Sequence, residues 1–577
     1  MKKKIEFISS IIIFISLIIS VNLKAQEKNK IPGLDNYISN IFKKLQIGLM
    51  PGASVLVSQN GDIIYQKGFG YADIEKKIPI TPVTKFKIGS ISKQFTTAAI
   101  LKLQEEGKIK IEDKLSKYIH DFPRGNEVTI YQLLTHTSGI HSYEFQRNFE
   151  MTKPITPKAL LDSIEKFPYD FNPGERYQYN NSGYCILGYI VAKISGKTLG
   201  DYLNETFFKP LGMNNTGIYE TNKVLNYEAQ GYSINGETVK KADFQEMSWA
   251  FGVGSIYSTT KDLYKWNEAI FNGKVLSEAT LKAAFTQAVL NSGGKVDYGY
   301  GWFLSTNRGL KFIQHSGVSN GFYSYLERQP ENKLTVCVLY NSLPTPEGIN
   351  PISNGQVISE FILSDKMEKQ NIGVIETTVS ENILKKYVGR YNYGHAMAML
   401  VTLKDKQLFG QITGQPQNPL TPISANEFYF KVMNAKIKFA SDSFSNVERI
   451  IQYQDGVSFE ANRLKDEILV KVNPDFFDNL TGKYDFGNNY VIEIVKENDK
   501  LFVLTPNMPK YELLPTSELD YFAMEVASKI SFTLNKEGKA ESLTSSFDRM
   551  TMIAKRIGDC QIKHREQILS KLKTNSK

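Results

Sequence analysis

Hydrophobic and polar positions divide the chain into a mixed first part and a last part made of short strands. In the first part, residues 37–45 place apolar side chains on one helical face, and Asp35 is the expected N-cap. Residues 53–58 and 63–71 flank Asn60-Gly61-Asp62, which is typical of a β-hairpin turn. The pattern therefore predicts a domain that opens with a helix and a hairpin.

A largely apolar helix is predicted next, beginning near Ser90 and ending at Gly107. Ser90 and Lys93 are three residues apart, so both side chains lie on one face of this helix. A serine at a helix N-terminus lies beside unpaired backbone N–H groups and the positive end of the helix dipole. The pair thus offers a nucleophile, a base and a place for an oxyanion. The same Ser-x-x-Lys spacing also occurs at Ser163, Ser258, Ser292 and Ser570, so the pair alone is not specific.

Two further polar segments adjoin predicted helices. His136 follows a short helix and is either catalytic or a structural residue that fixes its loop, which is the interpretation we favour. Tyr179 and Asn181 stand where a turn-rich loop enters an apolar helix over residues 185–194. A tyrosine near a lysine can act as a general base through its phenolate, and an asparagine can bind a substrate amide. In the alternative interpretation, Tyr179 packs at the helix start and Asn181 is its N-cap.

A strand over residues 309–314 is expected to end in His315-Ser316-Gly317, before a hairpin of residues 322–329 and 334–341. Such a strand end can present a side chain and an open backbone edge. Residues 317–321 also match G-x-S-x-G, which would make Ser319 the nucleophile. That motif requires a strand, a sharp turn and a helix, whereas a hairpin is expected here. We therefore prefer Ser90.

The last part of the chain predicts two small β-barrel or β-sandwich domains, over residues 384–470 and 475–560. They open with similar segments, residues 387–391 and 480–484. The predicted strands cover residues 399–403, 407–412, 427–430, 490–495, 501–504 and 530–534. No catalytic set stands out in these domains, and we expect them to pack on the first domain, shape its cleft or bind a partner.

The remaining segments concern export and flexibility. Residues 1–25 combine a basic start, an apolar run and a small residue before Gln26, which predicts a cleavable signal peptide and an exported, periplasmic or extracellular, protein. The apolar run is short for a membrane span. Residues 366–383 are polar and predict a linker, and residues 561–577 predict a basic tail that frays.

Charge and cysteine content exclude several kinds of function. The chain has 577 residues and a formal net charge of +9, without a basic stripe that contains aromatic residues, so no nucleic-acid partner is expected. The three cysteines lie far apart and form no C-x-x-C motif, so neither a metal nor another cofactor is expected. The expected partner is a small-molecule or peptide substrate, and the oligomeric state is open.

The residue types around Ser90, His136, Tyr179 and His315, and the order of these segments along the chain, resemble the serine β-lactamase and penicillin-binding-protein superfamily. The similarity lies with its branch of class C β-lactamases, DD-peptidases, D-aminopeptidases and esterases. It covers about residues 30–365 of a domain assigned to residues 26–365. The resemblance implies an α/β (α+β) fold with a five-stranded antiparallel sheet flanked by helices, an all-helical lobe, and a metal-free active site between them.

The resemblance also implies roles for individual residues. Ser90 would attack the acyl carbonyl, and Lys93 and Tyr179 would form the proton-relay pair. Asn181 would bind the substrate amide. The backbone N–H groups of Ser90 and Val318 would form the oxyanion hole. Nothing in the sequence resembles the glutamate base of class A enzymes.

One triplet departs from class C β-lactamases, which carry Lys-Thr-Gly where this chain has His315-Ser316-Gly317. A histidine is mostly neutral at pH 7, so it anchors a substrate carboxylate less well than lysine does. The triplet resembles the D-aminopeptidase and esterase side of the superfamily.

The predicted function is an exported serine hydrolase that forms an acyl-enzyme with D-amino-acyl peptides, peptidoglycan-like fragments or small esters. One alternative is a class C-like β-lactamase. A second is a non-catalytic penicillin- or peptidoglycan-binding protein that has the hydrolase fold but has lost its activity. A third is an adhesin that acts through its β-domains.

Overall fold

The computed structural model divides into two compact units, Met1–Glu368 and Lys369–Lys577. The predicted signal peptide, residues 1–25, and the basic tail, residues 561–577, lie outside the residues it describes. The described residues are 31–145, 150–235, 238–346, 350–368, 378–394, 396–433, 435–441, 446–454, 457–487, 490–505, 508–547 and 550–559.

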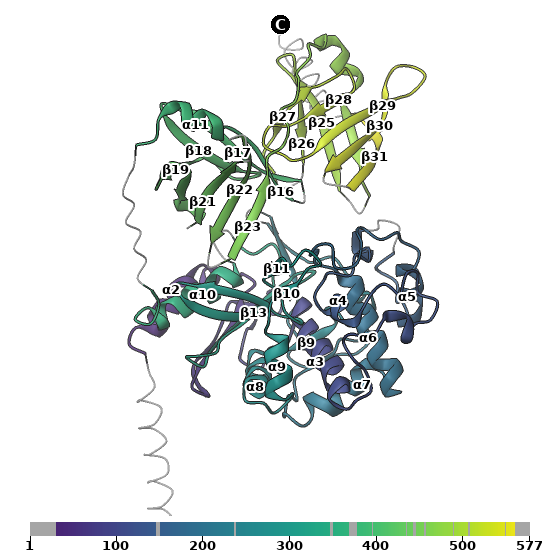
Figure 1. Ribbon diagram of the computed structural model, residues 1–577, viewed down its shortest axis with the longest axis vertical. Coiled ribbons are helices and arrows are strands. Elements are labelled where there is room, and N and C mark those ends of the chain that lie inside the picture. The colour runs from purple at the N-terminus through teal and green to yellow at the C-terminus, as the bar shows by residue number, and fades with distance from the viewer. Residues whose placement is uncertain are drawn as a thin grey trace, which may run out of the picture. The chain divides into compact units, whose positions relative to one another are not determined.

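The first unit contains a six-stranded antiparallel sheet, in the order β12-β13-β14-β15-β1-β2. Figure 1 labels β13 of this sheet. The resemblance implied five strands, and the sixth arises because β12 pairs with the edge of β13. The strands are β1 (Ala53–Gln59), β2 (Asp62–Phe69), β12 (Phe303–Asn307), β13 (Leu310–Ser319), β14 (Phe322–Gln329) and β15 (Leu334–Tyr340).

Both predicted hairpins of this sheet are present. Asn60 and Gly61 have φ angles of 54° and 85°, which a tight turn between β1 and β2 requires. β2 ends at Phe69, not at residue 71, because the chain turns at Gly70 and Tyr71–Asp73 pairs with a separate short strand. β14 has the predicted bounds, and β15 ends one residue before its prediction.

Helices cover both faces of this sheet. α2 (Leu34–Ile41) and α10 (Pro351–Leu363) share one hydrophobic core with inward residues of β1 and β15. α2 begins at Gly33, which adopts a left-handed conformation, so the predicted N-cap, Asp35, lies instead in the first turn. The predicted helix also ends early, at Ile41, and a short 3₁₀ turn (Lys43–Gln46) follows it.

The opposite face of the sheet belongs to a second core, built around α3 (Ser92–Glu105). Most α3 residues are buried, and Phe95 stacks on Trp266 of α8 with 4.0 Å between ring centroids. The expected α+β arrangement of sheet, flanking helices and helical lobe is confirmed. The other helices of this core are α4 (Ile130–Leu134), α5 (Pro157–Ile164), α6 (Asn181–Ser195), α7 (Leu199–Leu203), α8 (Thr260–Phe271) and α9 (Glu278–Ala284).

The second unit holds a short helix, α11 (Glu381–Tyr387), and two β-domains. The first is an eight-stranded sheet, β16–β23, and the second is a closed barrel, β24–β31. Strands of the first are Gly389–Gly394, Met397–Lys404, Gln407–Ile412, Asn418–Pro422, Glu427–Phe430, Ala435–Ser441, Val447–Gln454 and Val457–Asn462. Strands of the barrel are Gly482–Asp485, Val491–Glu497, Lys500–Leu504, Tyr511–Pro515, Asp520–Phe522, Lys529–Leu534, Ala540–Phe547 and Met550–Gly558.

The two β-domains share one contact at the segments with which they open. An arginine from the end of each domain packs against the opening glycine, Arg463 against Gly389 and Arg556 against Gly482. Arg463 donates to the Val388 carbonyl at 2.8 Å, and Arg556 donates to the carbonyl of Thr481 at 3.1 Å. The predicted pair of small all-β domains is confirmed.

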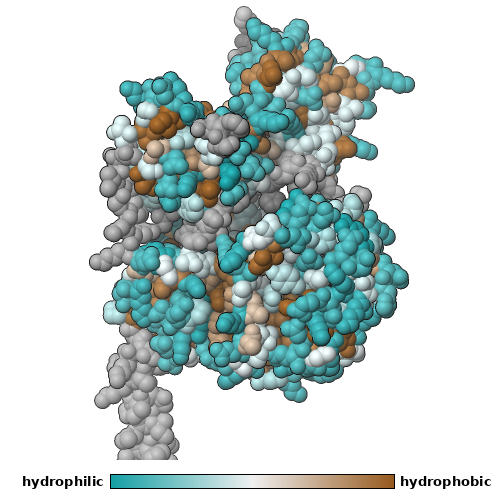
Figure 2. Space-filling view, viewed as in Figure 1, coloured by the Kyte–Doolittle hydropathy of each residue, from teal (hydrophilic) through white to brown (hydrophobic). Residues whose placement is uncertain are grey.

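The surface seen in Figure 2 is mostly hydrophilic, with hydrophobic residues in small scattered groups. Such a distribution is ordinary for a protein surface in contact with water. None of the described helices combines the length and the apolar character that crossing a bilayer requires.

The buried carboxyl of Glu327 makes the stability of the first unit depend on pH. Glu327 lies on β14, accepts a hydrogen bond from the Tyr325 hydroxyl at 2.7 Å, and has its pKa raised to about 7 by burial. Because the folded-state pKa exceeds the unfolded value of 4.5, stabilisation by the protonated form is complete below that value and is lost as the pH rises through about 7.

Glu327→Gln should therefore stabilise the protein by about 3 kcal/mol relative to wild type at pH 8, and change its stability little at pH 4. Urea unfolding at the two pH values checks this. A stability difference that is the same at both pH values would contradict the assignment.

Candidate active site

Ser90 and Lys93 meet as predicted, although Ser90 is not part of the helix itself. Ser90 lies in a 3₁₀ turn, Gly89–Ile91, that leads directly into α3. Lys93 is in the first turn of α3, is completely buried, and donates a hydrogen bond from Nζ to Ser90 Oγ at 2.9 Å. Ser90 is partly exposed. A partly exposed hydroxyl is thus coupled to a buried amine.

Burial lowers the pKa of Lys93, so that its amine can accept a proton at neutral pH. It lowers the pKa of Lys93 to about 7, while the negative charge of Glu144 acts in the opposite direction. A substantial fraction of the amine is therefore neutral at neutral pH and can accept the Ser90 proton.

Tyr179 lies on the other side of the same amine. Lys93 Nζ is 4.7 Å from the centre of the Tyr179 ring. Burial raises the pKa of Tyr179 well above 10, and a hydrogen bond with the Ser90 side chain opposes the shift. The resting form of Tyr179 is therefore the phenol and not the expected phenolate, because desolvation disfavours the charged form.

Asn181 begins α6, four residues before the predicted helix start. The N-cap is Asn180, whose side chain accepts a hydrogen bond from the Gly183 N–H at 2.8 Å, so the alternative role of Asn181 as N-cap is wrong. Asn181 Nδ2 donates to Glu144 at 2.7 Å, and its Oδ1 is buried without a hydrogen-bond partner among the residues that the structure describes. This geometry leaves a carbonyl oxygen available to accept a substrate N–H.

Glu144 is a residue of this site that the sequence analysis missed. It accepts a hydrogen bond from the Ser142 hydroxyl at 2.7 Å as well as the one from Asn181. Burial raises the pKa of the Glu144 carboxyl, while the Ser142 hydrogen bond and the charge of Lys93 oppose the shift. The one signal in the sequence was an acidic residue in the loop after His136.

His136 fixes its loop, which is the role we favoured. Its backbone has a φ of 57°, and its Nδ1 accepts a hydrogen bond from the Asn180 N–H at 3.1 Å. Its ring packs on Tyr179, with centroids 4.3 Å apart. Burial, reinforced by Lys93, lowers the pKa of His136 well below 6.5. A neutral histidine thus holds the segment that carries Tyr179 and Asn181.

His315 is buried on β13 and neutral. Its Nε2 lies 3.2 Å from the Tyr298 hydroxyl, and burial together with the charge of Lys93 lowers its pKa to about 3. The predicted end of the strand at residues 315–317 is wrong, because β13 continues to Ser319 and pairs there with Phe322 of β14. Ser316, on the same strand, is partly exposed.

Two glycines bring β13 against the Ser90 turn. A Cβ atom at Gly317 would lie 1.9 Å from the Ile88 carbonyl oxygen, and one at Gly89 would lie 2.5 Å from the backbone nitrogen of Val318. Among the described residues, β12 pairs with β13 only as far as Gln314, so the next part of this edge faces the turn. This close packing is compatible with an oxyanion hole formed by backbone N–H groups of Ser90 and Val318.

The competing serine lacks the required geometry. Ser319 is buried, and its Oγ lies 3.9 Å from the sulfur of Met247. The chain passes from β13 through a turn into β14, so residues 317–321 do not form the strand–turn–helix of a nucleophile elbow. Met247 also lines a depression of about 540 Å³, together with Tyr219, Glu220, Asn222, Glu246 and Phe251.

Comparison with known proteins identifies the class. The β-lactamase family model matches residues 38–352, more than half of the chain, which therefore belongs to this family. A model described as a domain of unknown function, DUF3471, matches residues 375–467. The protein is a serine hydrolase of the β-lactamase and penicillin-binding-protein superfamily.

Individual relatives agree with this assignment. A penicillin-binding protein of Bacillus subtilis (strain 168) is 29% identical over 74% of this chain and 98% of its own length. The octameric penicillin-binding protein homologue from Pyrococcus abyssi is 25% identical, with a TM-score of 0.51 over 84% of this chain and 99% of its own. D-amino acid amidase from Ochrobactrum anthropi SV3 shares the fold, with 23% identity and a TM-score of 0.52 over 58% of this chain and 99% of its own.

The lowered pKa of Lys93 predicts the pH dependence of acylation. The rate of Ser90 acylation by a fluorescent penicillin should rise with pH through about 7 and then level off, because only the neutral amine accepts the proton. Lys93→Arg should reduce this rate about a hundredfold or more, because arginine stays protonated.

His315→Gln is the matched control, because the His315 pKa of about 3 lies far from this range and the midpoint should stay near 7. Stopped-flow fluorescence between pH 5 and pH 9 measures both quantities. A midpoint close to 10 would mean that Lys93 is charged in the working enzyme.

Proposed function

We propose that this serine hydrolase acts outside the cytoplasm, forms a covalent acyl-enzyme on Ser90, and hydrolyses amide or ester bonds of D-amino-acyl peptides, peptidoglycan-like fragments or small esters. The observation that carries the proposal is the 2.9 Å hydrogen bond between the buried Lys93 amine and Ser90 Oγ. The basic and apolar pattern of residues 1–25 supports export.

Acylation follows from the positions of four groups. Ser90 Oγ attacks the substrate carbonyl carbon while its proton passes to the neutral Lys93 amine. The backbone N–H groups of Ser90 and Val318 hold the resulting oxyanion. The Tyr179 phenol donates a proton to the departing amine or alkoxide and regains one from Lys93. Water then attacks the ester on Ser90 by the reverse proton path and releases the acid.

Asn181 and Glu144 position the substrate in this scheme. Glu144 accepts a hydrogen bond from Asn181 Nδ2, and Oδ1, which has no partner among the described residues, accepts one from a substrate N–H. Removing that acceptor should matter more for amide substrates than for simple esters, which have no N–H to donate.

The charges of the site favour a substrate with a free amine over one with a carboxylate. His315 is neutral where class C β-lactamases carry a lysine, so β13 offers no cation at this position. Glu144 contributes a carboxyl beside Asn181. An ammonium group is attracted to such a site, whereas the carboxylate of a penicillin is not. This reasoning supports D-aminopeptidase or esterase activity over β-lactamase activity.

The substrate class can be tested with purified protein that begins at Gln26. D-alanyl-p-nitroanilide and p-nitrophenyl acetate should be hydrolysed faster than a chromogenic cephalosporin, and Ser90→Ala should abolish all turnover. Ser319→Ala is the control for the second serine and should keep most of the activity. Cephalosporin hydrolysis faster than the other two reactions would favour the class C-like β-lactamase. Turnover that persists in Ser90→Ala would exclude the proposed nucleophile.

A charge substitution tests the reason for this preference. His315→Lys adds a cation to β13 and should raise the ratio of cephalosporin to D-alanyl-p-nitroanilide hydrolysis about tenfold. Gln314→Lys adds the same charge one residue earlier on the strand, where the side chain points to the other face, and should change the ratio little. Equal effects of the two substitutions in kcat/KM measurements would argue against a role for His315 in specificity.

A further inference from the structure

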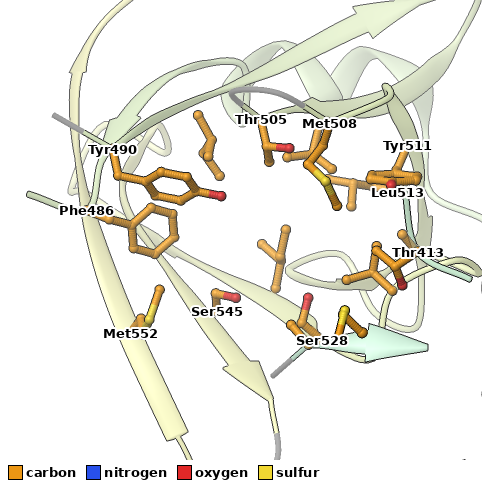
Figure 3. A pocket seen from close by; sticks show the side chains of 17 residues that line it. Thr413, Phe486, Tyr490, Thr505, Met508, Tyr511, Leu513, Ser528, Ser545 and Met552 are labelled. Atoms are coloured by element: carbon orange, nitrogen blue, oxygen red, sulfur yellow. The ribbon is translucent and has the colours of Figure 1, made fainter. Parts of the chain in front are cut away.

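The barrel of the last domain, β24–β31, contains a hydrophobic core and a cavity beside it. Side chains of alternate residues point into a barrel, so each strand contributes an inward row. Inward residues that are buried and do not line the cavity are Tyr484, Ile494, Leu501, Tyr521, Phe532, Leu543 and Ala554. Other inward residues line a cavity of about 390 Å³ (Figure 3).

The wall of the cavity is apolar and uncharged. Its lining includes Phe486, Ile492, Val503, Leu513, Ile530 and Met552. No acidic or basic side chain is among the lining residues of the described chain. A charged ligand group would therefore be left without a partner there, which is costly in an apolar environment.

Hydroxyl groups provide the polar contacts. Thr505 Oγ1 is buried and has no hydrogen-bond partner within the described part of the chain. The Tyr490 ring extends into the cavity with its hydroxyl toward the centre, and Thr505 lies on the neighbouring wall (Figure 3). A buried hydroxyl without a partner is unfavourable, and a ligand that supplies a hydrogen-bonding group would remove that cost.

The preceding β-domain completes the wall. Met397 pairs with Val526 of the β28–β29 loop, and the Ala527 N–H donates to the Ala396 carbonyl at 2.8 Å. Arg390 donates to the carbonyls of Met524 at 3.1 Å and Val526 at 2.5 Å. The loop that borders the cavity is thus held in place by backbone pairing and by an arginine, which preorganises the site.

We propose that this barrel binds an uncharged, mainly hydrocarbon molecule that carries one hydrogen-bonding group, such as a primary alcohol or a neutral ester. The cavity volume lies at the lower end of the range for small-molecule sites, which suits one short chain or one bicyclic ring. An eight-stranded barrel is just wide enough to hold one such ligand. Met397, Met508 and Met552 can adapt to its shape.

N-phenyl-1-naphthylamine, a neutral dye that fluoresces in apolar sites, is the probe for a test with the full chain from Gln26. Saturable binding of one dye per chain is expected. 1-Decanol and 1-naphthol represent the chain and the ring, and displacement by either supports the site and shows which shape it prefers. Decanoate should compete at least about tenfold less well than 1-decanol, because the wall offers its charge no partner.

Paired substitutions on β30 locate the site. Ser545 lines the cavity, so Ser545→Phe should weaken dye binding at least about tenfold. Ser546 is the next residue on the strand and lies on the outer face, so Ser546→Phe should leave binding unchanged. Thr505→Val should keep dye binding and weaken competition by 1-decanol, which gives a second result should Ser545→Phe fail to fold.

Three outcomes would overturn the proposal. They are the absence of saturable dye binding to the wild-type chain, equal binding by Ser545→Phe and Ser546→Phe, and stronger competition by decanoate than by 1-decanol. None of these outcomes depends on Ser90, so the proposal stands or falls separately from the proposed hydrolase activity.

Discussion

The removal of one lysine amine from water is the constraint on which the active site depends. Lys93 is held in the apolar core around α3, where the charged form of an amine is disfavoured. No ion pair of Lys93 with a carboxylate occurs in the described part of the chain, and Glu144 is instead engaged by Asn181 and Ser142. A direct ion pair would raise the Lys93 pKa and remove the neutral amine that the proposed mechanism requires. The hydrogen bonds that Glu144 accepts from Ser142 and Asn181 are thus compatible with a lowered pKa of Lys93.

The same constraint explains why so many neutral aromatic and imidazole rings surround the amine. His136, Tyr179 and His315 are all kept uncharged by burial, so none competes with Lys93 for its proton near pH 7. Each ring also positions the chain, and His136 does so by accepting a hydrogen bond from the Asn180 backbone. Burial therefore sets the protonation of the base and the rigidity of its surroundings together.

Local signals in the sequence were enough to predict the hairpins and the order of the motifs. They were not enough to predict where the helices start. The turn at Asn60 and Gly61 has one strongly preferred geometry, so these two residues alone predict the hairpin. The helix starts at Gly33 and Asn181 could not be predicted, because several neighbouring residues could each cap the helix. Tertiary packing determines which of them does so. Glu144 was missed because its closeness to Asn181 arises only when two distant loops meet. The barrel cavity was missed for a similar reason. Whether the barrel interior is filled depends on how side chains from strands far apart in the sequence pack together.

The most direct measurement of the central claim is the site of covalent attachment after brief reaction with a fluorescent penicillin. Intact-mass analysis followed by peptide mapping should find one acyl group per chain, on the peptide that contains Ser90, and none on Ser90→Ala. An acyl group on Ser319, or an acyl group that still forms on Ser90→Ala, would contradict the account.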